Sequence, residues 1–356
     1  MRRSLKMGYW PDEIGDCRLE RCIGAHMVKA VETVEVGADE GEVRVDRWLR
    51  RRFPQLSQGV IEKLVRTGQI RVDGARVKAN DRLVGGQLVR IPPLPEPPER
   101  APEAGLSAKD EAYVKSLVIH RDGDVIALNK PSGLAVQGGA KTGRHLDSLL
   151  DGLKFEREER PKLVHRLDKD TSGVLLLARH PRAAAFLAKS FRSRETQKVY
   201  WAVVLGCPRP GMGEIRGWLK KAGGAKESDH ELVRSAAHGE EGALFAITDY
   251  AVISEAFPRL AWLALKPVTG RTHQLRFHMA GMGHAILGDG KYTCALERPG
   301  ELPRQLHLHA RAVETPHPNG SLLRVIAPLP PHMEESFAAL GFEKGDAKNP
   351  FAAFGQ

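Results

Sequence analysis

HRLDKDTSG, residues His165–Gly173, is the most informative stretch of this chain. It places one carboxylate, Asp168, in a polar loop directly before the apolar run Val174–Ala178. An apolar run this short, bounded by Ser-Gly, is typical of a buried strand. The cations Arg166 and Lys169 beside Asp168 favour the ionised carboxylate near neutral pH, which suits an attacking group. On this stretch alone, a role for Asp168 in forming a turn or capping a helix is the more common outcome.

The composition is that of a soluble globular protein with one sizeable core and a second, smaller domain. The 356 residues are 42% hydrophobic and 28% charged. The sequence has neither an apolar run of membrane-spanning length nor an N-terminal secretory signal. Its four cysteines are too few and too scattered for a disulfide framework or a zinc site. We therefore expect a cytoplasmic protein without a membrane partner or a bound metal.

Positive charge is concentrated in one short segment. The net charge is +10, and between Arg44 and Arg90 twelve Lys or Arg residues oppose four acids, leaving +8 in 47 residues. Such a concentration is typical of a surface that binds nucleic acid. The alternative is a solvated face that promotes solubility, although scattered charges would serve that purpose equally well. The residues expected to contact RNA here are Arg47, Arg50, Arg51, Lys63, Arg66 and Arg71.

The N-terminal part of the chain predicts an extension and a small module. Residues 1–42 are aperiodic, so we expect little fixed structure there, and Met27 is a second candidate start. From residue 43 to residue 91 the pattern predicts two short helices, the second capped by Ser57, followed by a hairpin that turns at Asp73-Gly74. This layout resembles the S4 RNA-binding domain, which implies binding to structured RNA.

The remainder of the chain predicts a linker, a large domain and a tail. Residues 92–106 are rich in proline and indicate a semi-rigid linker. Residues 107–343 mix short apolar strands with helical stretches, without regular alternation of strand and helix. This mixture favours an α+β fold with a largely antiparallel sheet. Residues 344–356 form a C-terminal tail.

Several other chemistries lack a complete motif. Gly138–Thr142 resembles part of a phosphate-binding loop, but an alanine replaces the glycine that must precede the lysine. His307 and His309 alternate along a strand, yet no carboxylate or cysteine stands at matching spacing, which favours a structural role over metal binding. The sequence also lacks the Gly-x-Ser-x-Gly motif of serine hydrolases.

Two further stretches remain as candidates. Tyr200 lies on the less apolar face of a predicted strand, where on sequence alone an ordinary strand aromatic is the better interpretation. Arg271 is predicted to enter the first turn of a helix, where a cation is unfavourable unless an anion compensates it. Asp168 or an RNA phosphate would be such an anion, and a solvent-exposed arginine is the alternative.

Ordered motifs in the large domain resemble the RluA family of pseudouridine synthases. In chain order they are Asn129–Gly133, His165–Asp168, Lys198–Tyr200, Gly270–Arg276, Gly288–Tyr292 and Leu306–Ala310. The S4-like module and the variant of the Asp168 loop are most similar to the RluC branch, and the RluD branch is close. The resemblance implies a pseudouridine synthase fold with a largely antiparallel mixed sheet, joined to a small S4-like α+β domain.

The resemblance also assigns roles to four residues. Asp168 matches the catalytic aspartate, and Tyr200 matches the active-site tyrosine that stacks on the target base and assists proton removal. Arg271 matches the arginine that pairs with the aspartate. Arg166 matches the residue that helps to fill the space left by the flipped base, and we count it among the RNA-binding residues.

The implied reaction is isomerisation of specific uridines to pseudouridine in large-subunit (23S) ribosomal RNA. The C1′–N1 bond breaks and a C1′–C5 bond forms without redox change or hydrolysis, so we expect no cofactor. The aspartate either attacks C1′ directly or removes the 2′-proton to give a glycal, and the sequence leaves both routes open. The rival interpretations are a transfer-RNA pseudouridine synthase and a non-catalytic RNA-binding factor of ribosome assembly. We expect a monomer.

Overall fold

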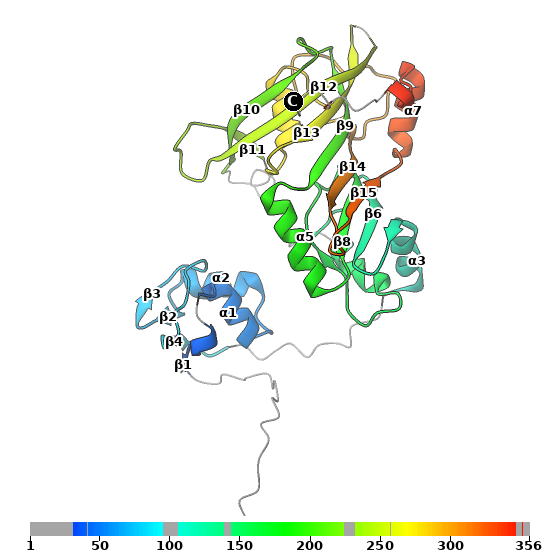
Figure 1. Cartoon of the computed structure of the whole chain (residues 1–356). Helices are drawn as coiled ribbons and strands as arrows, with labels where there is room; N and C mark the ends of the chain where they lie inside the picture. The colour runs from blue at the N-terminus through cyan, green and yellow to red at the C-terminus, as the bar shows by residue number, and fades with distance from the viewer. Residues whose placement is uncertain are drawn as a thin grey trace, which may run out of the picture. The chain divides into compact units, whose positions relative to one another are not determined.

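The computed structural model describes residues 31–40, 42–94, 106–138, 144–223, 232–256, 258–346 and 351. The chain folds as two compact units, Met1–Ala104 and Gly105–Gln356, and each is described by itself (Figure 1). No helix in the described part of the chain is long and apolar enough to cross a membrane.

The first unit is a small α+β module. Its helices are α1 (Val45–Arg52) and α2 (Gln58–Arg66), and its strands are β1 (Glu32–Glu35), β2 (Arg71–Val72), β3 (Ala75–Arg76) and β4 (Leu88–Ile91). The strands form one sheet in the order β1-β4-β2-β3. Ser57 caps α2 by accepting a hydrogen bond from the Val60 amide, as predicted. Asp73 and Gly74 both have positive φ, which confirms the predicted hairpin turn between β2 and β3.

The prediction that residues 1–42 lack fixed structure is wrong for their last part. Strand β1 pairs antiparallel with β4, and Val34 and Val36 are buried in the core with Trp48 of α1. The alternation that forms this strand is only a few residues long and lies among acidic residues, so the composition of the segment concealed it. The part of this prediction that concerns residues 1–30 lies outside the described residues.

The second unit is built on a large mixed sheet. Its strands begin with β5 (Val118–Arg121), β6 (Val125–Lys130), β7 (Lys162–Leu163), β8 (Ser172–Ala178), β9 (Gln197–Leu205) and β10 (Met212–Lys221). They continue with β11 (Val233–Ala236), β12 (Leu244–Ala256), β13 (Leu260–Pro267), β14 (Leu308–Pro316) and β15 (Leu322–Ile326). Within the described residues the order is β11-β10-β12-β13-β9-β14-β8-β6-β5, with β15 beside β14 and β7 beside β8. Among the described strands, only the pairing of β14 with β8 is parallel, so the predicted α+β fold with a largely antiparallel sheet is confirmed.

Helices cover both faces of this sheet (Figure 1). They are α3 (Ala108–Ser116), α4 (Leu146–Leu149), α5 (Pro181–Ser193), α6 (Gln274–Gly281) and α7 (Pro331–Leu340). Trp262 of β13 packs against Phe337 of α7, whereas the neighbouring Leu263 packs with Met279 of α6. Because successive strand residues point to opposite faces, α6 and α7 lie on opposite sides of β13.

The C-terminal segment contributes to this unit beyond the predicted boundary at residue 343. A short 3-10 turn, Lys344–Asp346, follows α7, and Phe351 is buried in the same core cluster as Trp262.

A close approach of strands places the Asp168 loop. Gly173, the second residue of β8, has a φ of +111° and pairs with Ala310 of β14. A Cβ at Gly173 would lie 2.7 Å from the Ala310 backbone nitrogen, so only glycine fits there. Ala310 is also the register partner of Tyr200 in β9. Strand β14 therefore lies between β8, which follows the Asp168 loop, and β9, which carries Tyr200.

Candidate active site

Asp168 lies in a loop whose backbone is tied at several points. The Asp168 carbonyl accepts a hydrogen bond from the Thr171 amide at 3.2 Å. The Lys169 carbonyl accepts one from the Gly133 amide at 2.9 Å, and the Ser132 hydroxyl donates to the Asp170 carbonyl at 2.8 Å. The side chain of Asp168 itself stays 28% exposed. The carboxylate is thus accessible, while the backbone that carries it is held in place.

Lys130, at the end of β6, is the centre of this anchoring. Its side chain is fully buried, and its ammonium donates to the carbonyls of Pro131, Leu134 and Lys169 at 2.8–2.9 Å. Burial lowers the pKa of Lys130 to about 7, and the carboxylates of Asp170 and Asp168 oppose that shift. Three carbonyl acceptors match the three N–H donors that only the protonated amine carries. Lys130 therefore ties the Asp168 loop to the loop that follows β6.

His165, at the start of the HRLD motif, is structural. Its ring stacks on Phe191 of α5 with centroids 4.4 Å apart, and its Nε2 accepts a hydrogen bond from the Leu176 amide at 2.9 Å. Burial lowers the pKa of His165 to about 3, so the ring is neutral at physiological pH. A neutral ring is required there, since Nε2 must accept from the backbone.

Arg276 of α6 is the arginine that faces Asp168. Its Nη1 lies 3.9 Å from the Asp168 Oδ2, and its Nε and Nη2 bind both carboxylate oxygens of Asp289 at 2.7 Å. Arg276 and Asp289 are both buried, and Asp289 also accepts from the Lys291 and Tyr292 amides. A separation of 3.9 Å exceeds hydrogen-bond length, so the contact with Asp168 is electrostatic. Asp289 fixes the guanidinium so that its remaining edge points at Asp168.

His273 supplies a second donor toward Asp168. The Tyr292 hydroxyl accepts from the Val233 amide and lies within hydrogen-bond distance of the His273 Nδ1, each at 2.9 Å. We assign the hydroxyl as the donor to Nδ1, which uses its proton and puts the proton of the neutral ring on Nε2, 3.9 Å from the Asp168 Oδ2. Burial lowers the pKa of His273, which keeps the ring neutral. His273 thus directs an N–H, and not a full charge, at the carboxylate.

The prediction that Arg271 pairs with Asp168 is wrong. The Arg271 Nε donates to the Phe245 carbonyl at 3.1 Å, and its amide donates to the Gln274 side chain. Helix α6 begins at Gln274, so Arg271 precedes the helix and does not enter its first turn. The arginine five residues later takes the predicted role, because the first turn of α6 points Arg276 inward.

Tyr200 and Arg166 are both near the Asp168 loop. Tyr200 is half-buried and packs against two core clusters, one that contains Leu167 and one that contains Leu275. Burial and the Asp168 carboxylate together raise the pKa of Tyr200 well above its usual range, so its hydroxyl remains protonated. Arg166 is exposed, two residues before Asp168. The roles of both residues in RNA binding or catalysis remain predictions.

Four further residues of the site lie in the motifs named above, although the sequence did not predict a role for them. Arg276, Asp289 and Tyr292 belong to the quoted Gly270–Arg276 and Gly288–Tyr292 motifs, and Lys130 belongs to Asn129–Gly133. The available signal was that one motif contains an arginine, Arg276, and another contains an aspartate, Asp289, with which it could pair. Spacing alone could not show which of the two arginines in the first motif turns inward.

The predicted RNA-binding residues of the first unit are all exposed. Arg47, Arg50 and Arg51 lie on α1, Lys63 and Arg66 on α2, and Arg71 on β2. Within the described residues, no acid lies within ion-pair distance of any of the six. Their charges are therefore not neutralised by the unit itself, and contact with RNA stays a prediction for each of them.

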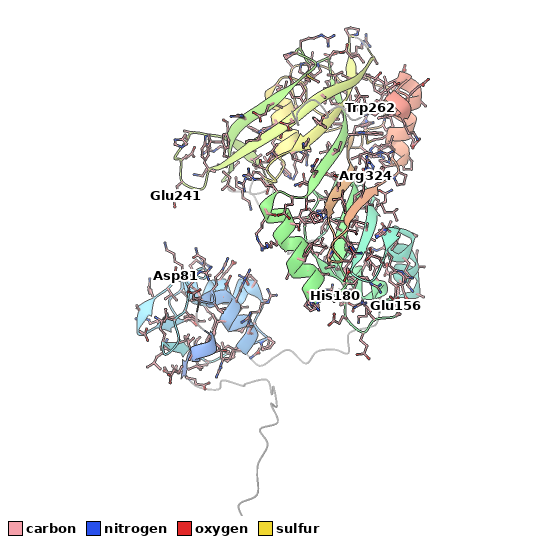
Figure 2. The ribbon with its side chains drawn as sticks, in the orientation of Figure 1. Asp81, Glu156, His180, Glu241, Trp262 and Arg324 are labelled. Carbon is pink, nitrogen blue, oxygen red and sulfur yellow. The ribbon has the colours of Figure 1, made fainter. Side chains whose placement is uncertain are left out.

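One cluster in the described residues, Asp122, Asp124 and His317, has the spacing of a metal site. The His317 Nδ1 accepts a hydrogen bond from the Asn319 amide, so its Nε2 carries the proton that faces Asp122 at 3.2 Å. A protonated nitrogen cannot bind a metal. His180 likewise directs its Nε2 at Asp124, at the end of the unit remote from Trp262 (Figure 2). The cluster is better interpreted as a hydrogen-bond network.

Both units of the chain are similar to known protein families. Residues 124–281 match the family model described as RNA pseudouridylate synthase, and residues 43–89 match the S4 domain. The chain is 33% identical over 329 residues to ribosomal large subunit pseudouridine synthase C of Vibrio vulnificus (87% of this chain, 96% of that protein). It is 38% identical over 254 residues to the protein of that name in Rickettsia conorii (70% and 82%).

A plant relative and a solved structure extend the likeness. The chain is 31% identical over 399 residues to RNA pseudouridine synthase 4, mitochondrial, of Arabidopsis thaliana (89% of this chain, 83% of that protein). The structure of human RNA Pseudouridylate Synthase Domain Containing 4 superposes with a TM-score of 0.54 at 29% identity, covering 65% of this chain and 97% of that one. The chain therefore belongs to the RNA pseudouridine synthase family, and its N-terminal module is an S4 domain.

Proposed function

We propose that this enzyme converts specific uridines of large-subunit ribosomal RNA to pseudouridine, with Asp168 as the catalytic carboxylate. The observation that carries the proposal is the position of Asp168: an accessible carboxylate on an anchored loop, faced by the buried Arg276 and by an N–H of His273. A charged group held by fixed donors is prepared for its reaction without further reorganisation.

The reaction needs a single carboxylate because the detached base is retained. The C1′–N1 bond breaks, the uracil rotates, and the C1′–C5 bond forms. The proton lost from C5 is balanced by the proton gained at N1, so the step is an isomerisation. Asp168 acts either by bonding to C1′ or by removing the 2′-proton, and both routes begin from the ionised carboxylate. The target nucleotide must leave its stack to reach a carboxylate in a protein loop.

Tyr200 takes part in its neutral form in this scheme. Its raised pKa opposes phenolate formation, so the phenol serves as a stacking surface and hydrogen-bond donor for the flipped uracil. Arg166, exposed beside the catalytic loop, takes the space that the base leaves in the RNA. Neither role requires a metal or an organic cofactor. We further propose that the enzyme acts as a monomer in the cytoplasm.

The ribosomal target is supported by two independent features. Two of the relatives described above carry large-subunit ribosomal names. The S4 domain presents its unpaired cations on α1, α2 and β2, and such a surface supplies binding to structured RNA that the catalytic loop lacks.

Comparison of ribosomal RNA from cells with and without this protein tests the target. Pseudouridines are mapped by chemical labelling and reverse transcription. Loss of specific 23S positions in the deletion strain, restored by the wild-type gene, is the expected result. Sites that disappear from transfer RNA instead would replace the ribosomal assignment with its transfer-RNA rival.

The Asp168→Asn variant tests the chemistry. The amide keeps the shape of the side chain but cannot act as a nucleophile or base, so we expect no pseudouridine on purified RNA and an RNA affinity within about twofold of wild type. The same gene should fail to restore the 23S positions in the deletion strain. Residual turnover by Asp168→Asn would remove Asp168 from the catalytic role, whereas rescue of ribosome assembly by this variant without any pseudouridine would favour the non-catalytic assembly factor.

A further inference from the structure

Lys198 of β9 is the charged member of the Lys198–Tyr200 motif, and the proposed reaction gives it no part. It lies two residues before Tyr200, and residues two apart on a strand share a face. A Cβ built on Gly270 would lie 3.8 Å from the Lys198 Nζ, which places the ammonium beside the turn that leads into Arg271. The side chain of Lys198 therefore reaches from β9, the strand that carries Tyr200, to the segment that carries Arg271.

The Lys198 ammonium has no anionic partner in the part of the chain that the structure describes. None of the hydrogen bonds or ion pairs among these residues includes it, although the residue is half-buried. The neighbouring His165 cannot serve as acceptor, because its Nε2 already binds the Leu176 amide. Burial lowers the pKa of Lys198, and the Lys198 charge in turn helps to keep His165 neutral.

An unpaired, half-buried ammonium is unfavourable for the free protein. Desolvation of a charge is costly unless a counter-charge or hydrogen bonds compensate it. Arg271, next to Gly270, also has no ion-pair partner among the described residues, and its Nε donates to the neutral Phe245 carbonyl. A local excess of positive charge next to a catalytic aspartate attracts an anion that arrives with the substrate.

We propose that the Lys198 ammonium binds a phosphate group of the RNA backbone next to the target uridine, with Arg271 flanking the same phosphate. RNA supplies one such anion at every nucleotide, and a lysine binds phosphate as a point charge. This contact would hold the flipped nucleotide by its backbone while Asp168 and Tyr200 engage the sugar and the base. The inference rests on the proposed function for the position of the uridine.

Binding and single-turnover measurements on the full chain test this contact. The probe is a fragment of 23S RNA that contains a mapped target uridine. For Lys198→Gln we expect a Kd about tenfold higher and a slope of log K against log salt that is smaller by about 0.7–0.9, as for one lost phosphate contact. The single-turnover rate at saturating RNA should stay within about twofold of wild type. Lys198→Arg should retain most of the affinity.

Two further readouts identify the phosphate and exclude a merely structural role. Single methylphosphonate substitutions around the uridine should reveal one position that weakens wild type as much as Lys198→Gln does and weakens that variant no further. Lys198→Met should leave the melting temperature unchanged or raise it, because an unpaired buried charge is removed. Lys109→Gln, which removes an exposed lysine of α3 with no ion-pair partner among the described residues, is the matched control and should change neither Kd nor the slope by more than Lys198→Arg does.

Two results would overturn the proposal. One is a Kd and salt slope of Lys198→Gln equal to those of wild type. The other is a rate at saturating RNA that falls more than tenfold with an unchanged Kd, which would place Lys198 in the chemistry itself. The binding slopes need no turnover, so they test Lys198 even where Asp168→Asn retains full activity, a result that would count against the proposed function alone.

Discussion

Asp168 is surrounded by groups that orient it without neutralising it. The nearest full positive charge, on Arg276, is already paired with Asp289, and the second neighbour, His273, is a neutral ring. Both contacts with Asp168 are 3.9 Å long in the free protein. Catalytic hydrogen bonds often shorten only when substrate binds. In the proposed reaction, this arrangement would leave the Asp168 carboxylate free to act while fixing the direction from which it meets C1′.

The two arginines of the Gly270–Arg276 motif are predicted to differ in function. Arg276→Gln removes the cation next to Asp168 and leaves Asp289 buried without its partner, so we expect the single-turnover rate to fall by about 100-fold or more. Arg271→Gln loses a backbone hydrogen bond and a flanking charge, and should mainly raise the Kd for RNA. Rapid-quench measurement of pseudouridine formation at saturating RNA separates the two. Equal loss of rate in both variants would contradict the assignment of Arg276.

The sequence predicts only some of the residues that form the candidate active site. The sequence predicts Asp168 because its motif precedes a buried strand and is followed by other motifs in a fixed order. It does not predict which arginine points inward, because helix α6 starts three residues later than the glycine turn indicates. The start of a helix depends on backbone contacts that the sequence does not display, such as the left-handed conformation of His273.

At the scale of elements, hydrogen bonds and strand pairing fix the position of the Asp168 loop relative to the strands around it. Lys130 and Ser132 tie it to the end of β6, and the pairing of Gly173 with Ala310 ties β8 to β14. The strands β6, β8 and β14 could each be predicted from their apolar residues and the turn residues beside them. Strand β1 could not, because its apolar alternation is short, and the parallel pairing of β8 with β14 could not, because it depends on a long-range backbone contact.

The Gly173→Ala variant tests the strand approach. A Cβ at this position would collide with the backbone of Ala310, and the φ of +111° is strained for alanine. We expect a loss of unfolding free energy of about 3 kcal/mol or more, measured by urea denaturation. Gly217→Ala in β10 is the matched control, because open space surrounds its Cβ, and should shift the unfolding free energy by less than about 1 kcal/mol. Equal stability of the two variants would contradict the close approach.

At the scale of the whole molecule, buried neutral histidines make stability depend on pH. Burial lowers the pKa values of His278, His307 and His309 to about 4 each, below the ordinary value of 6.5. The unfolded chain therefore binds more protons than the native protein between pH 6.5 and pH 4. Stability from these groups is complete above pH 6.5 and is lost as the pH falls toward 4.

Urea denaturation at pH 7.0 and pH 5.5 measures this loss. Each histidine contributes up to about 1.4 kcal/mol per pH unit within the window, so we expect a drop of a few kcal/mol in unfolding free energy. His278→Gln should reduce the dependence on pH, whereas His238→Gln, which changes an exposed histidine, should leave it unchanged. A stability that does not change between the two pH values would show that these rings are protonated in the native protein as readily as in the unfolded chain.

The division of labour between the S4 domain and the catalytic unit predicts a separable effect on binding. Replacement of Arg47, Arg50 and Arg51 on α1 by glutamine removes three exposed cations that have no ion-pair partner in the described residues. If all three meet phosphates, the slope of log K against log salt should fall by about 2–3, because each phosphate contact contributes about 0.7–0.9. The single-turnover rate at saturating RNA and the melting temperature should not change, since the three side chains are remote from the core.

A triple variant of the catalytic unit is the matched control for this charge change. Arg209, Arg216 and Arg234 are also exposed, but each is paired with a glutamate, in turn Glu255, Glu214 and Glu240. Their replacement by glutamine removes the same formal charge from side chains that are already neutralised, so we expect a much smaller change in slope. If the two triple variants weakened RNA binding equally, net charge alone would account for affinity. The S4 domain would then have no special part in placing ribosomal RNA against Asp168.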